Sequence, residues 1–323
     1  MLLSDQTIHL RYRVLGPLGE GGMGTVYLAE DHLLGCSCAI KESVLDPKAS
    51  PHVLAQMRHQ FQAEARVLAN LDHPNLPKVH DFFSFDGNEY IVMEYIEGEN
   101  LHSLHERQKG PLNEQIVLAW ADQILDALVY LHGQQPHPII HRDIKPANII
   151  LTPQGKVSLV DFGLVKLLDP ADPRTATAMK GMGTAEYAPL EQYAGGAGHT
   201  DARTDIYSLG GTLYHLLTGE PPLDVHQRLL DPGQMPSARQ LNSMLSVRTD
   251  EALMKALEIH PNRRFSSAID MRNAMQRLPD PSGTVKSSKL SDKDAASTLS
   301  LALPLLILAV PFIMLLLLGR CSS

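Results

Sequence analysis

The apolar residues of the chain recur in two stretches with the spacing of an amphipathic helix. In residues 57–71, apolar positions and Glu64 are spaced by four, three, four and three residues, which places them on one helix face. The apolar members are Met57, Phe61, Leu68 and Leu71. A second stripe, in residues 113–132, consists of Val117, Trp120, Ile124, Leu128 and Leu131. We predict a helix over each stretch, with the stripe facing the core.

Shorter apolar runs bounded by glycine or polar residues predict strands. Val14 precedes a cluster of four glycines within residues 19–24, and Val26 begins an apolar run directly after it. This order is typical of a strand, a tight turn and a second strand. Two more strands are expected in residues 36–42 and 90–95.

The glycine cluster admits a structural and a functional interpretation. Glycine clusters commonly form flexible turns or linkers, but a linker would not be flanked by apolar strands. Backbone N–H groups without a neighbouring Cβ can instead approach a phosphate. A dinucleotide-binding turn would need a helix directly after the glycines, whereas residues 25–28 look extended. The spacing Gly19-x-Gly21-x-x-Gly24-x-Val26 is more typical of a lid over a nucleotide.

Lys41 and Glu64 form a second candidate group. Lys41 lies in the predicted strand 36–42, where a lysine is commonly a solvated edge residue. Glu64, however, lies on the inward face of the first predicted helix, and a buried carboxylate without a partner is costly. We therefore predict an ion pair between them that holds the Lys41 ammonium where it can meet phosphate oxygens.

Residues 88–101 are expected to join two lobes. The strand at 90–95 is followed by polar residues and a glycine. In this hypothesis the backbone of residues 94–96 faces a nucleotide base, and Met93 stands just inside the pocket. An ordinary strand and turn explains the local pattern equally well.

The segment Ile139–Leu151 crowds charged and apolar residues together, and Pro146 excludes a helix interior there. A further strand then ends at Asp161. The carboxylates of Asp143 and Asp161 and the amide of Asn148 are therefore expected at neighbouring loop ends. Oxygen ligands of this kind suit Mg²⁺, which retains several water ligands and is also coordinated by phosphate oxygens.

Composition limits the classes of protein to consider. The 323 residues are 44% hydrophobic and 20% charged, which permits a sizeable core in one two-lobed domain or two ordinary domains. The net charge of −8 argues against a protein whose main function is to bind nucleic acid.

The C-terminal part of the sequence predicts a membrane anchor. Residues 279–298 are polar and rich in Ser, Lys and Asp, which is typical of a flexible juxtamembrane linker. Leu301–Leu318 then presents eighteen uncharged positions, near the length of about 20 apolar residues that crosses a bilayer. We interpret residues 299–319 as a transmembrane tail anchor rather than a buried core helix. The lysines before it place the folded part on the cytoplasmic side; they are Lys286, Lys289 and Lys293.

Taken in order, these motifs closely resemble the protein kinase family over residues 10–276. They are the glycine lid, the lysine of Ala39-Ile40-Lys41, Glu64, the loop His141-Arg142-Asp143-Ile144-Lys145-Pro146-Ala147-Asn148, and Asp161-Phe162-Gly163. The amino-acid sequences of these motifs are similar to those of bacterial Ser/Thr kinases of eukaryotic type. The resemblance implies an α+β, two-lobed fold, with a small β-rich N-lobe at residues 10–96 and a larger, mainly helical C-lobe at 97–278, followed by the predicted transmembrane helix.

The resemblance also implies a role for each motif residue. Asp143 would accept the proton of the substrate hydroxyl, and Lys145 would neutralise the γ-phosphate of ATP. Asn148 and Asp161 would hold Mg²⁺, while Lys41, oriented by Glu64, would bind the α- and β-phosphates. The residues expected around the nucleotide are Gly19, Glu20, Gly21, Gly22, Met23, Gly24, Val26, Ala39, Lys41, Met93, Glu94, Ile96 and Asn148.

Residues 164–188 would form the activation loop. A phosphorylated Thr175 or Thr177 would supply an anionic partner for Arg142, although both threonines can equally be ordinary solvated loop residues. Thr184 is expected near Asp143, where it would shape the substrate groove.

Further expectations concern the larger lobe. Ala188-Pro189-Leu190-Glu191 replaces the family's usual Ala-Pro-Glu, and spacing assigns the glutamate to Glu191, with Arg264 as its partner. Asp205 is expected to hold the backbone of the catalytic loop. Gly210 and Gly211, each costing roughly 1 kcal/mol against alanine inside a helix, are expected to pack closely against that loop.

The implied function is a membrane-anchored Ser/Thr protein kinase that uses ATP and Mg²⁺, autophosphorylates and signals from the inner face of the cell membrane. Its partners would be protein substrates and, through a single-pass helix, the lipid bilayer, but not nucleic acid; a homodimer is possible. The alternative is a pseudokinase scaffold without turnover, but such proteins usually lose the equivalents of Lys41, Asp143 or Asp161. A small-molecule kinase of similar fold is disfavoured by Lys145 and Thr184.

Overall fold

A computed structural model describes residues 2–21, 24–43, 50–161, 185–193, 200–231 and 233–276. The chain divides into two units, residues 1–278 and 279–323, and only the first contains described residues. The predicted linker and tail anchor therefore lie outside the described residues. Among the helices of the described part, none combines the length and the apolar character needed to span a bilayer.

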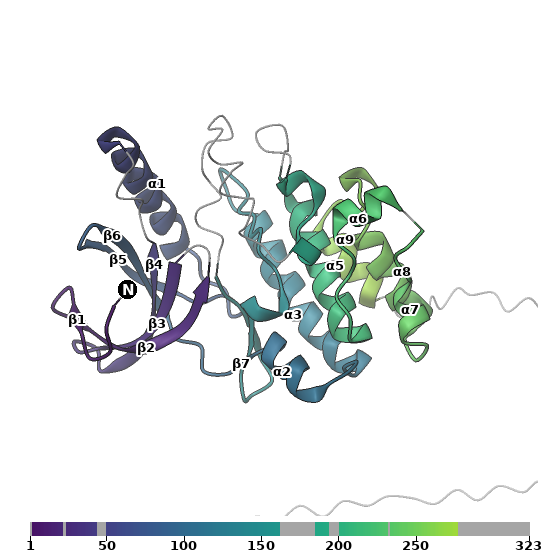
Figure 1. Ribbon diagram of the computed structural model, residues 1–323, viewed down its shortest axis with the longest axis horizontal. Coiled ribbons are helices and arrows are strands. Elements are labelled where there is room, and N and C mark those ends of the chain that lie inside the picture. Colours follow the sequence, from purple (N-terminus) through teal and green to yellow (C-terminus); the bar gives the residue numbers. More distant parts are fainter. Residues whose placement is uncertain are drawn as a thin grey trace, which may run out of the picture. The chain divides into compact units, whose positions relative to one another are not determined.

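A six-stranded antiparallel sheet forms the small lobe (Figure 1). The strand order is β1-β2-β3-β4-β6-β5, with β1 at Thr7–Ile8, β2 at Tyr12–Gly21, β3 at Gly24–Asp31, β4 at Cys36–Ser43, β5 at Val79–Phe85 and β6 at Asn88–Glu94. Helix α1 (Pro51–Ala69) packs against β5 and β6. The sequence predictions of a strand–turn–strand unit at the glycines and of a helix through residues 57–71 are thus confirmed in type, with the helix beginning earlier and ending at Ala69.

The large lobe is mainly helical. Helix α3 (Glu114–His132) confirms the second predicted stripe, and Asn113 caps its first turn through Oδ1. Helix α5 (Ala202–Thr218) is buried along nearly its whole length, between α3 and α8. The remaining helices are α2 (Leu101–Gln108), α6 (Val225–Leu230), α7 (Ala238–Leu241), α8 (Val247–Ala256) and α9 (Ala268–Gln276).

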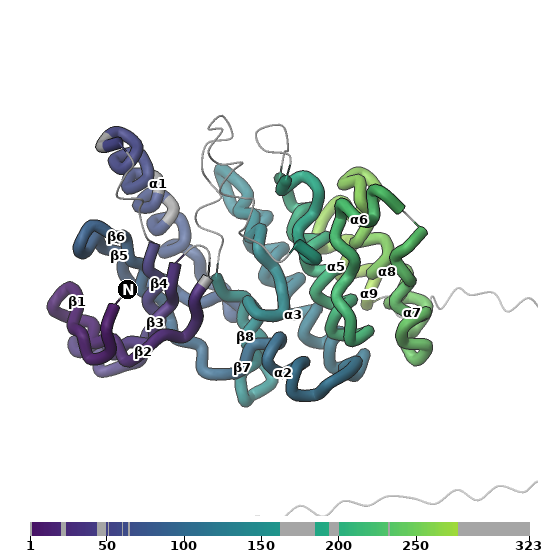
Figure 2. The backbone as a smooth tube through the Cα atoms, in the orientation of Figure 1, coloured from purple at the N-terminus to yellow at the C-terminus, as the bar shows by residue number. Residues whose placement is uncertain are grey.

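A small sheet presents the loops that carry the predicted chemistry. It has the order β7-β8-β9, with β7 at Glu99–Asn100, β8 at Ile149–Leu151 and β9 at Val157–Leu159. The tube in Figure 2 shows this sheet beside α2, between the six-stranded sheet and the helices. The predicted catalytic loop enters β8 through the short 3-10 turn η1 (Pro146–Asn148), and Asp161 follows β9.

Two apolar clusters stabilise the unit. One lies within the six-stranded sheet around Tyr12, Tyr27 and Tyr90. The other is continuous from Leu68 and Ile91 of the small lobe into the helices of the large lobe. Because this second cluster includes residues of both lobes, the loops between them are held by packing from either side.

Gly24 is required by the sheet itself. Its φ is +129°, and a Cβ there would lie 1.9 Å from the backbone oxygen of Glu42 on β4. Gly19, by contrast, has no heavy atom within 4 Å of its virtual Cβ. The neighbouring strand therefore explains the glycine at position 24. Contacts of Gly19 and Gly24 with a phosphate stay predictions.

The expectation that Gly210 and Gly211 pack against the catalytic loop is wrong. A Cβ on Gly210 would lie 2.8 Å from that of Ala256, and a Cβ on Gly211 would contact Pro222 and Tyr187 at 3.4 Å. The next residue, Thr212, is the one that reaches the loop, through a 3.4 Å hydrogen bond from Oγ1 to the carbonyl of Ile144.

Substituting Gly24 by alanine should destabilise the small lobe because the new Cβ overlaps β4 and the backbone has positive φ. We expect Gly24→Ala to lower the free energy of unfolding by about 2 kcal/mol or more, measured by urea denaturation. Gly19→Ala is the matched control and should change this free energy by less than about 1 kcal/mol. Equal effects of both substitutions would contradict the role assigned to Gly24.

Candidate active site

The backbone of the catalytic loop is held by the buried carboxylate of Asp205. Its Oδ2 accepts the N–H of His141 at 2.9 Å, and its Oδ1 accepts the N–H of Arg142 at 2.8 Å. His132 Nε2 lies 2.8 Å from the same Oδ2. Asp205 has no exposed surface, so these hydrogen bonds satisfy a carboxylate that would otherwise be costly to bury. The prediction for Asp205 is confirmed, and His132 is a partner that sequence reasoning missed.

Two residues of the site have left-handed backbone conformations, Arg142 at φ +68° and Asp161 at φ +61°. Non-glycine residues of this kind cost of order 1–3 kcal/mol and persist only where their surroundings enforce them. For Arg142 the surroundings are visible: Asp205 accepts its N–H, and Gln192 Nε2 donates to its carbonyl at 2.8 Å. Gln192 follows Glu191 in sequence, so the segment after the predicted activation loop fixes the catalytic loop.

Asp143, Lys145 and Asn148 form one hydrogen-bonded group. Lys145 Nζ lies 3.1 Å from Oδ2 of Asp143. Asn148 Nδ2 donates to the same Oδ2 at 2.9 Å and to the Asp143 carbonyl at 2.8 Å. The carboxylate of Asp143 is therefore fixed by a cation and an amide, as the orientation of a general base requires.

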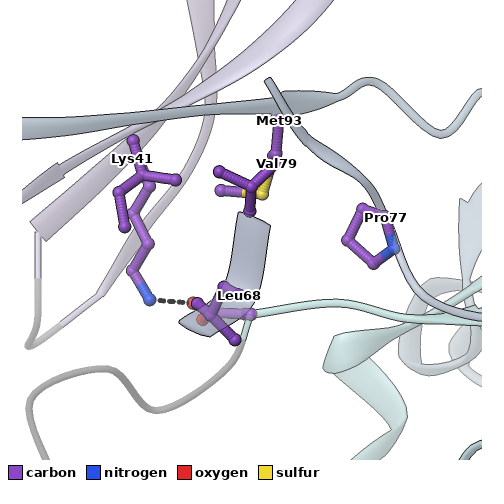
Figure 3. Close-up of a pocket in the computed structure, with 7 residues that line it drawn as sticks. Lys41, Leu68, Pro77, Val79 and Met93 are labelled. Atoms are coloured by element: carbon purple, nitrogen blue, oxygen red, sulfur yellow. Dashed lines mark hydrogen bonds and ion pairs between the residues drawn. The ribbon is translucent and has the colours of Figure 1, made fainter. Parts of the chain in front are cut away.

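Lys41 and Asp161 form a second group, joined by an ion pair between Nζ and Oδ1 (Figure 3). Lys41 is 5% exposed, and the sheet places it on β4 opposite Val26 and Ile91. The pair borders a small pocket lined also by Leu68, Pro77, Val79, Ile91 and Met93. Met93 thus lines this pocket, and its contact with a nucleotide stays a prediction. Glu64 lies within α1, but its side chain is outside the described part, and its pairing with Lys41 stays a prediction.

The two groups share one electrostatic environment. Burial raises the pKa of the Asp161 carboxyl, but the charge of Lys41 and its hydrogen bond outweigh burial, so that the pKa lies below its ordinary value. The charge of Lys145 lowers the pKa of Asp161 further. Burial lowers the pKa of His141, which therefore stays neutral. Asp161 is consequently an anion at neutral pH, as a metal ligand must be.

One face of the sheet matches the predicted nucleotide surface. Directly opposed residues of antiparallel strands lie on the same face, which makes Val26, Lys41 and Ile91 one row and Leu28, Ala39 and Met93 the next. Glu94 ends β6, and its N–H donates to the carbonyl of Lys78 at 2.8 Å. Contacts of the other predicted nucleotide residues stay predictions, and Gly22 and Met23 lie outside the described residues.

The donor set fits a hard divalent cation. Because Nδ2 of Asn148 donates to Asp143, its Oδ1 is the amide atom left for a metal, and Asp161 supplies a carboxylate. Within the described ranges, no cluster of three or more His, Cys, Asp or Glu residues could hold a metal. One carboxylate and one amide suit Mg²⁺, which takes its remaining ligands from phosphate and water.

Arg264 and Glu191 form the buried ion pair that spacing predicted. Arg264 donates to Oε1 at 2.6 Å and to Oε2 at 3.1 Å, and the side chains are 0% and 9% exposed. Arg264 also donates to the backbone carbonyls of Glu258, Arg203 and Ile259. The guanidinium is thereby satisfied, so Leu190 before Glu191 does not displace the glutamate from its role.

Sequence reasoning missed a buried group behind the segment that follows Thr184. Tyr187 Oη and His215 Nδ1 share a 2.6 Å hydrogen bond, and His105 lies edge-on to His215 with ring centroids 4.5 Å apart. Among the described residues, neither ring nitrogen of His105 has a hydrogen-bond partner. Burial lowers the pKa of His215 to about 4 and raises the pKa of Tyr187, so both are neutral at pH 7. Helical spacing alone would make both histidines look like ordinary core positions.

Several predicted residues lie outside the described ranges. They are Phe162, Gly163, Thr175, Thr177 and Thr184. Their proposed roles stay predictions.

Comparison with known proteins agrees with this geometry. Residues 12–277 match the family model described as the protein kinase domain. The chain is 33% identical over 84% of its length to the serine/threonine-protein kinase PrkC of Bacillus subtilis, and 34% identical over 90% to PknB of Mycobacterium tuberculosis. It spans only 41% and 46% of those two relatives. A crystal structure of the Mycobacterium tuberculosis PknI kinase domain is 32% identical, with a TM-score of 0.65, covering 85% of this chain and 98% of that one.

The chain therefore belongs to the protein kinase family, and its relatives carry the names of bacterial serine/threonine-protein kinases. The two-lobed fold expected from the sequence is confirmed. The family uses ATP with a divalent metal ion, which the oxygen donors described above can accommodate.

Breaking the buried ion pair should be strongly destabilising because the remaining charge stays buried without its partner. We expect Arg264→Met to lower the free energy of unfolding by about 3–5 kcal/mol, measured by urea denaturation. The control is Arg107→Met, which removes the exposed Glu99 pair, whose side chains are 63% and 38% exposed, and should have little effect. Similar losses in the free energy of unfolding of both variants would contradict the conclusion that burial makes the Arg264–Glu191 pair important for stability.

The low pKa of His215 predicts a pH-dependent stability. Below its ordinary pKa of 6.5 the unfolded chain binds a proton at this histidine, whereas the folded chain does not until about pH 4. The free energy of unfolding should therefore fall as the pH drops through this window, by about 1–2 kcal/mol at about pH 5. Urea denaturation at neutral pH and at about pH 5 should show that His215→Gln loses less of its free energy of unfolding between the two than the wild type does. An identical pH dependence in the variant would exclude His215 as its source.

Proposed function

We propose that this chain is an active Ser/Thr protein kinase that transfers the γ-phosphate of ATP to protein hydroxyls. The observation that carries the proposal is the orientation of Asp143, whose carboxylate is fixed by Lys145 and Asn148 and lies in one electrostatic environment with Asp161. Protein kinases need such positioned groups because phosphoryl transfer depends on orientation and charge stabilisation rather than on covalent chemistry of the enzyme.

In this proposal Asp143 accepts the proton of the substrate hydroxyl while its oxygen bonds to the γ-phosphorus. The bond from that phosphorus to the bridging oxygen breaks, and ADP leaves. Lys145, beside Asp143, stabilises the negative charge of the transferred group, and Lys41 binds the α- and β-phosphates. Mg²⁺, held by Asn148 and Asp161, would neutralise charge on the phosphate oxygens.

The geometry favours this function over a pseudokinase scaffold. A scaffold needs no oriented base, yet Asp143 has two side-chain partners within 3.1 Å. Lys41 and Asp161 are both present and form an ion pair at the edge of the pocket. Their arrangement supports turnover, and the kinase names of the relatives point the same way.

Two finer proposals concern regulation and location. Autophosphorylation at Thr175 or Thr177 would place a phosphate where it can pair with Arg142, whose backbone is already fixed beside Asp143. The apolar sequence Leu301–Leu318 supports a single-pass anchor in the cell membrane with the kinase domain in the cytoplasm. The substrates would then be proteins reached from the inner face of the membrane.

Replacing Asp143 by asparagine should remove the base while keeping the side chain's shape. We expect Asp143→Asn to lower phosphoryl transfer from labelled ATP with magnesium by about 10²–10⁴-fold, with nucleotide binding retained in calorimetry. Asp86→Asn, in an exposed turn of the small lobe, is the matched control and should keep full activity. Equal labelling by wild type and Asp143→Asn would contradict the role of Asp143 as the base. Nucleotide binding by the wild type without any transfer would favour the scaffold.

Mass spectrometry of the active wild-type protein tests the regulatory proposal. We expect phosphate on Thr175 or Thr177 and lower activity in the double variant Thr175→Ala, Thr177→Ala, because the phosphate proposed to pair with Arg142 is then absent. An active protein in which both threonines are unmodified would rule out this switch.

A further inference from the structure

The large lobe carries an exposed apolar surface far from the candidate active site. It consists of Ile116, Leu241, Met244 and Val247, which are 50%, 38%, 87% and 53% exposed; we call it the α7–α8 patch. Figure 1 shows α7 and α8 at the end of the large lobe farthest from the six-stranded sheet. Contiguous exposed apolar residues commonly mark a surface that contacts another molecule or a membrane.

Hydrogen bonds join the parts of the patch. Ser246, between Met244 and Val247, donates through Oγ to Glu114 Oε1 at 2.7 Å. Glu114 begins α3, and Ile116 lies two residues further along the same helix. On the other side, Asn242 Nδ2 donates to the carbonyl of Leu217 at 2.8 Å, which fixes the end of α7. The patch is therefore built on anchored backbone.

The path of α9 relates this surface to the rest of the chain. Arg272 binds Asp126 at 2.7 Å and Asp122 at 2.6 Å, and Gln276 at the end of α9 donates to Asp122. Helix α9 thus runs antiparallel to α3, and its C-terminal end points toward the beginning of α3. Asp122 is six residues from Ile116, about 9 Å along the helix axis. The described unit therefore ends against α3, about 9 Å along its axis from Ile116, and α9 is directed toward the end of α3 that carries Ile116.

The sequence beyond this point suggests what covers the patch. Residues 279–298 have the composition of a flexible linker, which would span about 25 Å on average, and the uncharged run Leu301–Leu318 follows. A bilayer that accepts this run would lie within reach of the patch at high effective concentration, so that a weak apolar contact suffices. Exposed charges beside the patch are of both signs, Arg239, Arg248 and Glu251, which favours insertion of apolar side chains over attraction by charged headgroups.

We propose that the α7–α8 patch rests on the bilayer surface, with Met244 and Val247 inserted at the interface between headgroups and acyl chains. This inference rests on the membrane anchor proposed above. The large lobe would then lie against the membrane, and the small lobe would extend away from it. The candidate active site would open toward soluble proteins rather than toward lipid.

Fluorescence quenching by lipids tests this orientation in the full chain. A dye is attached at Met244→Cys in a Cys36→Ser, Cys321→Ser background, and the protein is placed in phosphatidylcholine–phosphatidylglycerol vesicles with acyl-chain spin labels. Interfacial side chains lie about 5–10 Å into the boundary, so emission should fall roughly twofold. Leu33→Cys, at an exposed leucine of the small lobe, is the matched control and should keep its emission.

Vesicle flotation separates this proposal from the one on which it rests. A chain that fails to float with vesicles overturns both the anchor and the contact of the patch with lipid. Flotation with no quenching at Met244→Cys, or with equal quenching at Leu33→Cys, overturns the patch proposal alone. Disulfide cross-linking of two chains through Met244→Cys, without quenching, would assign the patch to a second copy and also overturn it.

A second variant tests whether the patch itself makes the contact. With the dye at Ile116→Cys, the substitutions Met244→Glu and Val247→Glu should abolish the quenching while the chain still floats. Neither residue touches the candidate active site, so phosphoryl transfer to a soluble substrate should be unchanged in this variant. Unchanged transfer shows that the variant is folded. Persistent quenching in this variant would contradict the proposal.

Discussion

The buried carboxylate of Asp205 is the interaction on which the catalytic loop depends. It accepts the backbone N–H groups of His141 and Arg142 and thereby stabilises a left-handed residue immediately before Asp143. Without these hydrogen bonds, the left-handed conformation of Arg142 would be unfavourable, and Asp143 would lose its fixed position. Asp205 binds the backbone of the loop before Asp143 and not Asp143 itself, so its role is that of a positioning residue.

The constraint extends from the catalytic loop to the segment that follows the predicted activation loop. Gln192 binds the carbonyl of Arg142, and its neighbour Glu191 is fixed by Arg264. Tyr187 in the same segment is joined to His215 of α5, the helix that also carries Asp205. One central helix therefore supports both sides of the substrate region, which explains why it is buried along nearly its whole length.

The sequence predicted the elements of this site better than the reasons for individual residues. Helical spacing located α1 and α3, and motif order located Asp143, Asn148 and Asp161, because those patterns are local. The structural reason for the glycine at position 24 was missed because the atom that excludes a side chain there is a carbonyl on β4, and a sequence motif does not show backbone contacts between strands. The Tyr187–His215 contact joins residues 28 positions apart, which no local pattern indicates.

The ion pair between Lys41 and Asp161 constrains how ligands can enter the pocket. Phosphate alone would draw Lys41 away from a carboxylate, and a cation alone would draw Asp161 away from an ammonium; either exchange sacrifices one buried attraction to create another. A metal ion and a polyphosphate that arrive together replace both partners at once. If the proposed function holds, the pocket would admit a metal–polyphosphate complex more readily than either of its halves.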